Sequence, residues 1–165
     1  MARTVEEVNE SIKEAHDLIE KQDILRKELT AKLEAQSNEY NALQKQKEAL
    51  DNANAEIVNL CNTLRSNFNA MHETYNNVNG FAYGLAEFAL EKINSVQNET
   101  LNKISVMIEK INSQMSSCSS DFEQAEEQMK QANKTIENAV SSLNELDLEL
   151  KESQAEEEMN AMIGM

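Results

Sequence analysis

The sequence predicts an all-α fold, a long antiparallel two-helix hairpin packed as a coiled coil. Three observations predict this class: two long heptad patterns of apolar residues, a short segment with Asn and two glycines between them, and the absence of proline. The four Phe and three Tyr residues among 165 residues are few for a globular core. We therefore expect a single elongated helical-hairpin domain over residues 1–165, able to oligomerise into a larger helical bundle.

The first predicted helix covers residues 4–78 and follows one unbroken heptad. Seventeen of its 22 seam positions are apolar, in a chain that is only 40% hydrophobic overall. These positions are Val5, Val8, Ile12, Ala15, Ile19, Gln22, Arg26, Leu29, Leu33, Gln36, Tyr40, Leu43, Lys47, Leu50, Asn54, Ile57, Cys61, Leu64, Phe68, Met71, Tyr75 and Val78. One narrow apolar face of this length needs a second helix to cover it.

The sequence Asn-Gly-Phe-Ala-Tyr-Gly at 79–84 predicts the turn, because Asn and Gly tolerate the left-handed backbone that ends a helix. The second predicted helix covers 85–158, and a flexible, acidic and Met-rich tail follows at 159–165. The two arms are nearly equal in length. Equal arms around a short turn favour an antiparallel hairpin.

The seam of the second helix is regular from Leu101 onward. Its members are Leu101, Ile104, Ile108, Ile111, Met115, Cys118, Phe122, Ala125, Met129, Ala132, Ile136, Ala139, Leu143, Leu146 and Leu150. Before Leu101 the pattern is looser, and Phe88, Ala89, Ile93 and Val96 mark the expected buried side. The serine-rich segment 116–120 allows either a continuous helix or a kink, because its capping-box spacing competes with an uninterrupted heptad.

Five seam positions of the first helix are polar: Gln22, Arg26, Gln36, Lys47 and Asn54. We expect the small residues of the second seam, from Cys118 to Ala139, to lie opposite this stretch and to let the long polar stems pass out beyond the seam. Polar seam residues fix register at some cost in stability. They are candidate partner-binding residues, and two alternatives stay open: a self-sufficient hairpin, or a site where a further helix packs.

Aromatic residues gather around the predicted turn. Phe68, Tyr75, Phe81, Tyr83 and Phe88 fall within 21 residues of one another. They predict either a hydrophobic cap that closes the end of the hairpin or a contact tip for a partner protein. Phe81, Tyr83 and Phe88 are therefore candidate partner-binding residues as well.

The formal net charge is −15, from 30 acidic and 15 basic residues. Such a chain is repelled by nucleic-acid phosphates and by anionic membranes, so we expect no nucleic-acid partner. We also expect no membrane span and no signal peptide. Twelve acids and three lysines lie within 121–158, which predicts a solvated helix face or, alternatively, a docking surface for a basic partner.

No arrangement of residues in the sequence predicts catalysis, a cofactor or a metal. His16 and His72 each follow a seam position directly and have no triad partner or metal-ligand spacing nearby. Cys61 and Cys118 fall on the seams, where we expect buried thiols. The abundant acids lie on straight helices without the cleft that acid–base chemistry needs, so we expect a protein that is not an enzyme.

The segment 84–88, Gly-Leu-Ala-Glu-Phe, opens the second predicted helix and resembles the second half of the small WXG-type helical hairpins of type VII (ESX) secretion and the partners of LXG toxins. Ala82 stands where those proteins carry Trp. Phe122 and Glu126 resemble their export signal, an aromatic residue followed four residues later by an acid. The resemblance covers about residues 78–130 and implies a type VII secretion substrate, partner or adaptor.

The expected function is a non-enzymatic helical module that binds a helical protein partner or a second copy of itself. The residue pattern favours a cytoplasmic protein, and the resemblance implies export by a non-classical type VII route. The alternative function is an intracellular coiled-coil structural or scaffold subunit.

Overall fold

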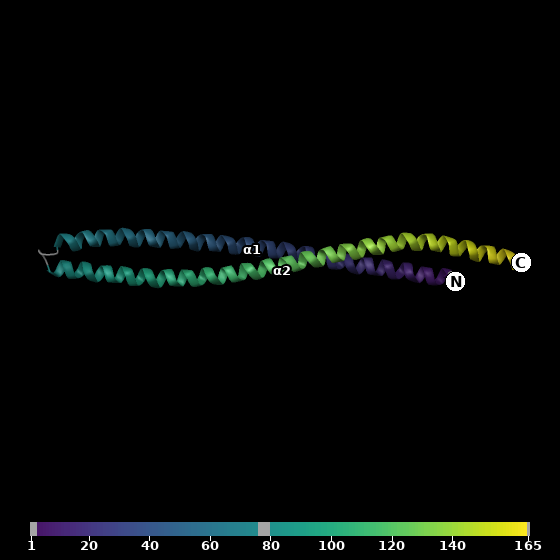
Figure 1. Ribbon diagram of the computed structural model, residues 1–165, viewed down its shortest axis with the longest axis horizontal. Coiled ribbons are helices and arrows are strands. Elements are labelled where there is room, and N and C mark those ends of the chain that lie inside the picture. The colour runs from purple at the N-terminus through teal and green to yellow at the C-terminus, as the bar shows by residue number, and fades with distance from the viewer. Residues whose placement is uncertain (1–2, 76–79, 165) are drawn as a thin grey trace. The chain divides into compact units, whose positions relative to one another are not determined.

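The computed structural model describes residues 3–75 and 80–164, and in these residues it forms two long helices that pack against each other. Helix α1 is Val5–Tyr75 and helix α2 is Gly80–Ile163 (Figure 1). No strand occurs among the residues so described. The predicted all-α helical hairpin is thus confirmed.

Contacts divide the chain into two compact units. Unit 1 comprises Met1–Ser37 and Ser120–Met165, and unit 2 comprises Asn38–Ser119, so each unit contains one segment of α1 and one of α2. Within each unit the two segments run antiparallel (Figure 1). In unit 1, Arg3 contacts Glu149 and Arg26 lies beside Met129, so the residue numbers rise along one helix as they fall along the other.

Helix α1 begins with a capping box in unit 1. The Thr4 amide donates to Glu7 Oε2 at 2.9 Å, and the Glu7 amide donates back to Thr4 Oγ1 at 3.3 Å. These two bonds satisfy amides that have no carbonyl partner in the first helical turn. The Thr4-x-x-Glu7 spacing therefore explains why the helix starts at Val5.

The core of unit 1 is a single file of side chains between its two helix segments. Val8 and Ala125 are completely buried, and Leu29, Ala132 and Ala139 are nearly so. Three of these five residues are alanines of α2 spaced seven residues apart. Their small side chains let α1 approach closely, so the large side chains of α1 fill the remaining space.

Cross-helix polar contacts hold the end of unit 1. Arg3 forms an ion pair with Glu149 at 3.3 Å, and the Ser153 hydroxyl donates to the Arg3 carbonyl at 3.0 Å. Ser153 is only 5% exposed and lies three residues beyond Leu150, at the next seam position. The buried hydroxyl is satisfied by this bond, and it ties α2 to the first residues of α1.

The core of unit 2 is built in the same way, with two isoleucines among its α2 residues. Leu43 and Cys61 from α1 are buried, as are Ala86, Ile104 and Ile111 from α2. Cys118 is buried here too, and no disulfide joins Cys61 and Cys118. Their burial matches the position that the heptad predicts for them.

The heptads account for burial along both helices. All fifteen seam positions predicted for α2 are buried or half-buried, and so are 17 of the 21 described positions in α1. The four exposed ones are Arg26, Tyr40, Leu64 and Tyr75. Val78 lies outside the described residues.

The helix bounds differ from those that the sequence predicts. Residues 80–84 are the first residues of α2, whereas the sequence predicts a turn there; Asn79 and the predicted helix end at 76–78 lie outside the described residues. The turn prediction relied on left-handed glycines, and no described glycine has a positive φ. At the other end α2 continues to Ile163 and includes most of the predicted tail. The helix is continuous through 116–120, so the heptad prevails over the capping-box signal.

Replacing Gly84 by Ala tests the helical assignment of 80–84. A Cβ at Gly84 meets nothing within 4 Å, and Ala is favoured over Gly inside a helix, so Gly84→Ala should raise the free energy of unfolding by about 1 kcal/mol. Urea denaturation followed by circular dichroism measures this gain. Gly164→Ala is the matched control, because Gly164 follows the end of α2 and should give no such gain. Destabilisation by Gly84→Ala would contradict the helical assignment of residues 80–84 and support the turn that the sequence predicts.

Candidate functional site

An apolar stripe runs along the exposed side of α2 in unit 2. It comprises Phe81, Leu85, Phe88 and Val96, whose exposed fractions are 82%, 49%, 58% and 57%. The first three are spaced four and three residues apart, so they lie on one face of the helix. A contiguous exposed apolar surface of this kind marks an interaction site more often than scattered apolar residues do.

Charged residues continue the same face of α2. The Lys92 ammonium lies over the Phe88 ring, 5.8 Å from its centroid, in a cation–π contact. Glu99 lies about one turn beyond Val96, and it accepts a hydrogen bond of 2.9 Å from Lys103, one turn further on. The hydrogen bond from Lys103, and then its positive charge, lower the pKa of the Glu99 carboxyl below its ordinary value. The apolar stripe is therefore followed by lysines and a stably ionised acid.

Tyr83 lies on the other side of α2 from Phe81. Successive residues of a helix are about 100° apart, so side chains two positions apart point in nearly opposite directions. The half-buried Tyr83 ring stacks on the His72 ring of α1, with a centroid distance of 3.9 Å and an interplanar angle of 29°. The aromatic cluster thus divides: Tyr83 and His72 join the two helices, while Phe81 and Phe88 are exposed.

Phe88 and Val96 are more exposed than the sequence predicts. The loose pattern before Leu101 places both on the buried side, with Ala89 and Ile93, which are half-buried in the structure. In the structure the α2 seam continues from Leu101 towards the start of the helix through Gln97, Ile93, Leu90 and Ala86, at steps of four, four, three and four residues. Gln97 and the small Ala86 occupy seam positions, so the larger apolar side chains Phe88 and Val96 lie beside the seam and are exposed.

Arg65 is the main polar link between the helices of unit 2. Its guanidinium donates to Asn94 Oδ1 at 2.9 and 3.2 Å, to Gln97 Oε1, and to Asn62 Oδ1 at 2.9 Å. Three of these four donations reach α2, whereas Asn62 lies on α1 with Arg65, and the three that cross fix both the separation and the register of the two segments. The sequence interpretation missed Arg65; the only signal is a basic residue directly after seam residue Leu64.

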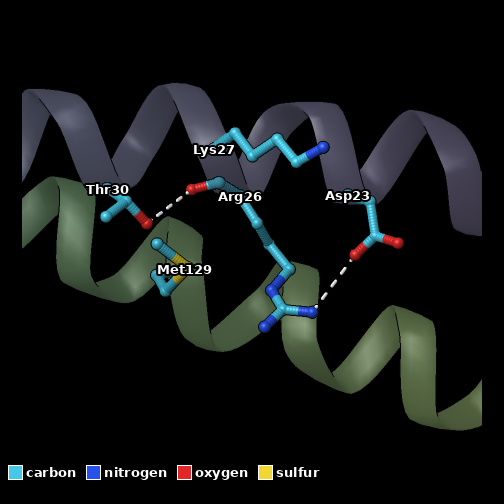
Figure 2. A pocket seen from close by; sticks show the side chains of 5 residues that line it. All are labelled: Asp23, Arg26, Lys27, Thr30 and Met129. Carbon is cyan, nitrogen blue, oxygen red and sulfur yellow. Dashed lines mark hydrogen bonds and ion pairs between the residues drawn. The ribbon is translucent and has the colours of Figure 1, made fainter.

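Three of the five predicted polar seam residues, Gln22, Arg26 and Gln36, lie in the α1 segment of unit 1. Gln22 and Gln36 are half-buried, and Arg26 is exposed. Arg26 forms an ion pair with Asp23 of its own helix at 3.2 Å, and Thr30 Oγ1 donates to the Arg26 carbonyl at 2.8 Å (Figure 2). Its charge thus lies outside the seam, in accordance with the expectation for this residue.

A surface hollow of about 420 Å³ adjoins the Arg26 side chain. Asp23, Arg26, Lys27 and Thr30 line it from α1, and Met129 is its one lining residue from α2 (Figure 2). The hollow combines both signs of charge with one thioether. It offers no set of convergent polar groups that would select a ligand.

The remaining predicted site residues do not form one surface. Lys47 and Asn54 are half-buried seam residues of unit 2, whereas Ala125, Ala132 and Ala139 belong to unit 1, so the expectation that these small residues lie opposite all five polar seam residues is wrong for Lys47 and Asn54. Phe122 of the export-signal resemblance is half-buried on the α2 seam of unit 1, and Glu126 is exposed. The structure therefore brings together the exposed apolar residues of α2, and it disperses the polar seam residues along α1.

The described residues contain no group of three or more His, Cys, Asp or Glu side chains that could hold a metal ion. Neither described helix has the length of apolar sequence needed to cross a membrane. No protein-family model, characterised protein or solved structure matches this chain. The resemblance to WXG-type proteins accordingly stays a prediction.

Replacing Arg65 by Lys tests the polar link in unit 2. The substitution keeps the charge but loses the planar fork, so we expect the free energy of unfolding to fall by about 1 kcal/mol. Arg26→Lys is the matched control, because Arg26 pairs only with Asp23 on its own helix and should cost less than about 0.5 kcal/mol. Equal losses in the two variants, measured by urea denaturation, would contradict the role given to Arg65.

Substituting Tyr83 and Phe81 separately tests the division of the aromatic cluster. Tyr83→Ser removes the stack on His72 and should lower the free energy of unfolding by about 1.5 kcal/mol. Phe81→Ser removes a side chain that is 82% exposed and should cost about 0.5 kcal/mol. Thermal or urea unfolding of each single variant measures the difference. If Phe81→Ser lowered the free energy of unfolding more than Tyr83→Ser, Phe81 would belong to a hydrophobic cap instead.

Proposed function

We propose that this chain is a non-enzymatic helical module that binds protein through the apolar stripe of α2. The observation that carries the proposal is the exposure of Phe81 and Phe88 on one face of a helix whose other face packs on α1. Aromatic side chains dominate the energy of many protein interfaces because each removes a large apolar area from water.

The spacing of the stripe favours a helical partner. Its members follow the three- and four-residue steps of a helix face, and such a ridge fits the groove between side chains of another helix. Lys92 and the Glu99–Lys103 pair supply charges beside the apolar contacts, where they select among partners rather than add much affinity. A partner that is a secretion component or a subunit of a scaffold would use the same surface, and both stay predictions.

Site-specific photo-crosslinking in the cells that produce the protein tests this function. Benzoylphenylalanine replaces Phe88 in one full-length variant and the exposed Glu87 in a matched control, whose side chain lies on another side of α2. We expect discrete covalent adducts, identified by mass spectrometry, at position 88 only. Adding Phe81→Ser should remove most of them, because the two aromatic residues contact one partner.

Equal, diffuse labelling at positions 87 and 88 would contradict the proposal, since it would show an exposed surface without a specific partner. The absence of adducts at both positions would contradict it as well. The double variant should retain its helical circular dichroism, which separates loss of binding from loss of the fold.

A further inference from the structure

We propose that the apolar stripe binds the same stripe of a second copy of this chain, with the two α2 helices antiparallel about a two-fold axis between Ser95 and Val96. This inference rests on the proposed function and names the partner of that surface. It is carried by the pattern of charges along α2, and each element of the pattern lies in unit 2.

The stripe continues beyond Val96 as an exposed row with the same helical spacing. Glu99, Lys103, Val106 and Lys110 follow at steps of three, four, three and four residues, and all are exposed. A helix face of about eight turns is therefore available for contact between residues 81 and 110. Such a row meets a partner helix along its whole length only if that helix is nearly parallel or antiparallel to it.

Antiparallel pairing brings unlike groups together at every charged step. Lys92 of one copy lies opposite Glu99 of the second copy, and the two-fold axis repeats this pair. Lys103 lies opposite Phe88 of the second copy, where it can form a cation–π contact of the kind that Lys92 already makes with Phe88. Lys110 lies opposite Phe81 in the same way.

The apolar members match as well. Leu85 lies opposite Val106 of the second copy, and Val96 lies beside the axis, next to Ser95 of the second copy. In a parallel, in-register pair the same row would place Lys92 against Lys92 and Glu99 against Glu99. Like charges directly opposite each other are destabilising, so the sequence of the row selects the antiparallel arrangement.

The distribution of net charge favours contact through unit 2. Unit 1 holds 21 of the 30 acids and nine of the 15 basic residues, so its net charge is −12, whereas unit 2 has nine acids and six basic residues and a net charge of −3. Two copies of a chain with a net charge of −15 repel each other. The repulsion is least where the contact lies in the unit with little net charge.

The size of the contact sets the expected affinity. Five exposed apolar side chains from each copy, Val106 included, remove on the order of 1,000 Å² from water, near the lower limit for specific interfaces. We therefore expect a reversible dimer with a dissociation constant of about 1–100 μM rather than a permanent one.

Charge reversal tests the pairing of Lys92 with Glu99. Sedimentation equilibrium of the full chain between about 1 and 300 μM should give a monomer–dimer equilibrium with a dissociation constant of about 1–100 μM. Lys92→Glu and Glu99→Lys should each weaken it by about tenfold or more, because each creates two like-charge pairs. The double variant should restore most of the wild-type affinity. Lys45→Glu, an exposed change of the same charge in unit 2, should leave the dimer nearly unchanged.

Disulfide trapping tests the register independently. Ser95 and Ser113 are both exposed and lie 18 residues, or five turns, apart on the same side of α2. Under mild oxidation Ser95→Cys should give a covalent dimer, because the two copies of position 95 lie beside the axis. Ser113→Cys should give none, because its two copies lie far apart in an antiparallel pair. Wild-type protein measures any background from the buried Cys61 and Cys118.

Three outcomes would overturn the proposal. One is a monomer at all concentrations, another is a dimer that neither charge reversal affects, and the third is equal trapping at positions 95 and 113, which would indicate parallel pairing. Photo-crosslinking at position 88 separates these failures from failure of the proposed function. Adducts with a different protein would support the proposed protein-binding function and contradict the self-pairing. If neither adducts nor a dimer formed, both proposals would be contradicted.

Discussion

The rest of the structure depends on one constraint: each unit is only two helices thick and can bury side chains only along the seam between them. Val8 and Ala125 are completely buried in unit 1, and Ala86 is completely buried in unit 2. A longer helix adds further seam residues but never a second layer. Stability therefore grows with the length of the seam, and any apolar residue off the seam stays in water unless another chain covers it.

A seam alone does not choose between registers, because a shift by one heptad puts similar apolar residues opposite each other. Polar contacts that cross between the helices remove this ambiguity. Arg65 reaches Asn94 and Gln97 in unit 2, and Ser153 donates to the Arg3 carbonyl in unit 1. Each contact is made fully only in one alignment, since a shift leaves a half-buried guanidinium or a buried hydroxyl without its acceptor.

The sequence alone predicts the fold class and most of the seam, because burial between two helices repeats every seven residues and needs no knowledge of distant contacts. It does not predict the start of α2 at Gly80, since Gly is compatible with both a turn and a first helical turn. Arg65 and Ser153 are invisible for a different reason. Their roles depend on which residues of the other helix lie opposite them, and a pattern along one helix carries no such information.

The structure separates aromatic residues that the sequence groups together as one candidate contact. The sequence names Phe81, Tyr83 and Phe88 together as candidate partner contacts, whereas in the structure Tyr83 packs on His72 and only Phe81 and Phe88 are exposed. Closeness in the sequence does not show in which direction each side chain points. On a helix, side chains two residues apart point in nearly opposite directions. Two phenylalanines on an exposed face make no use of the only core that a two-helix unit has, and their contact with water is unfavourable. They lie in unit 2, whose net charge is −3, rather than in unit 1, whose net charge is −12, so a second copy of this acidic chain meets less repulsion there. In the function that we propose, the partner contacts the side chains that the seam leaves outside, and the charges beside the apolar stripe select which helix can cover it.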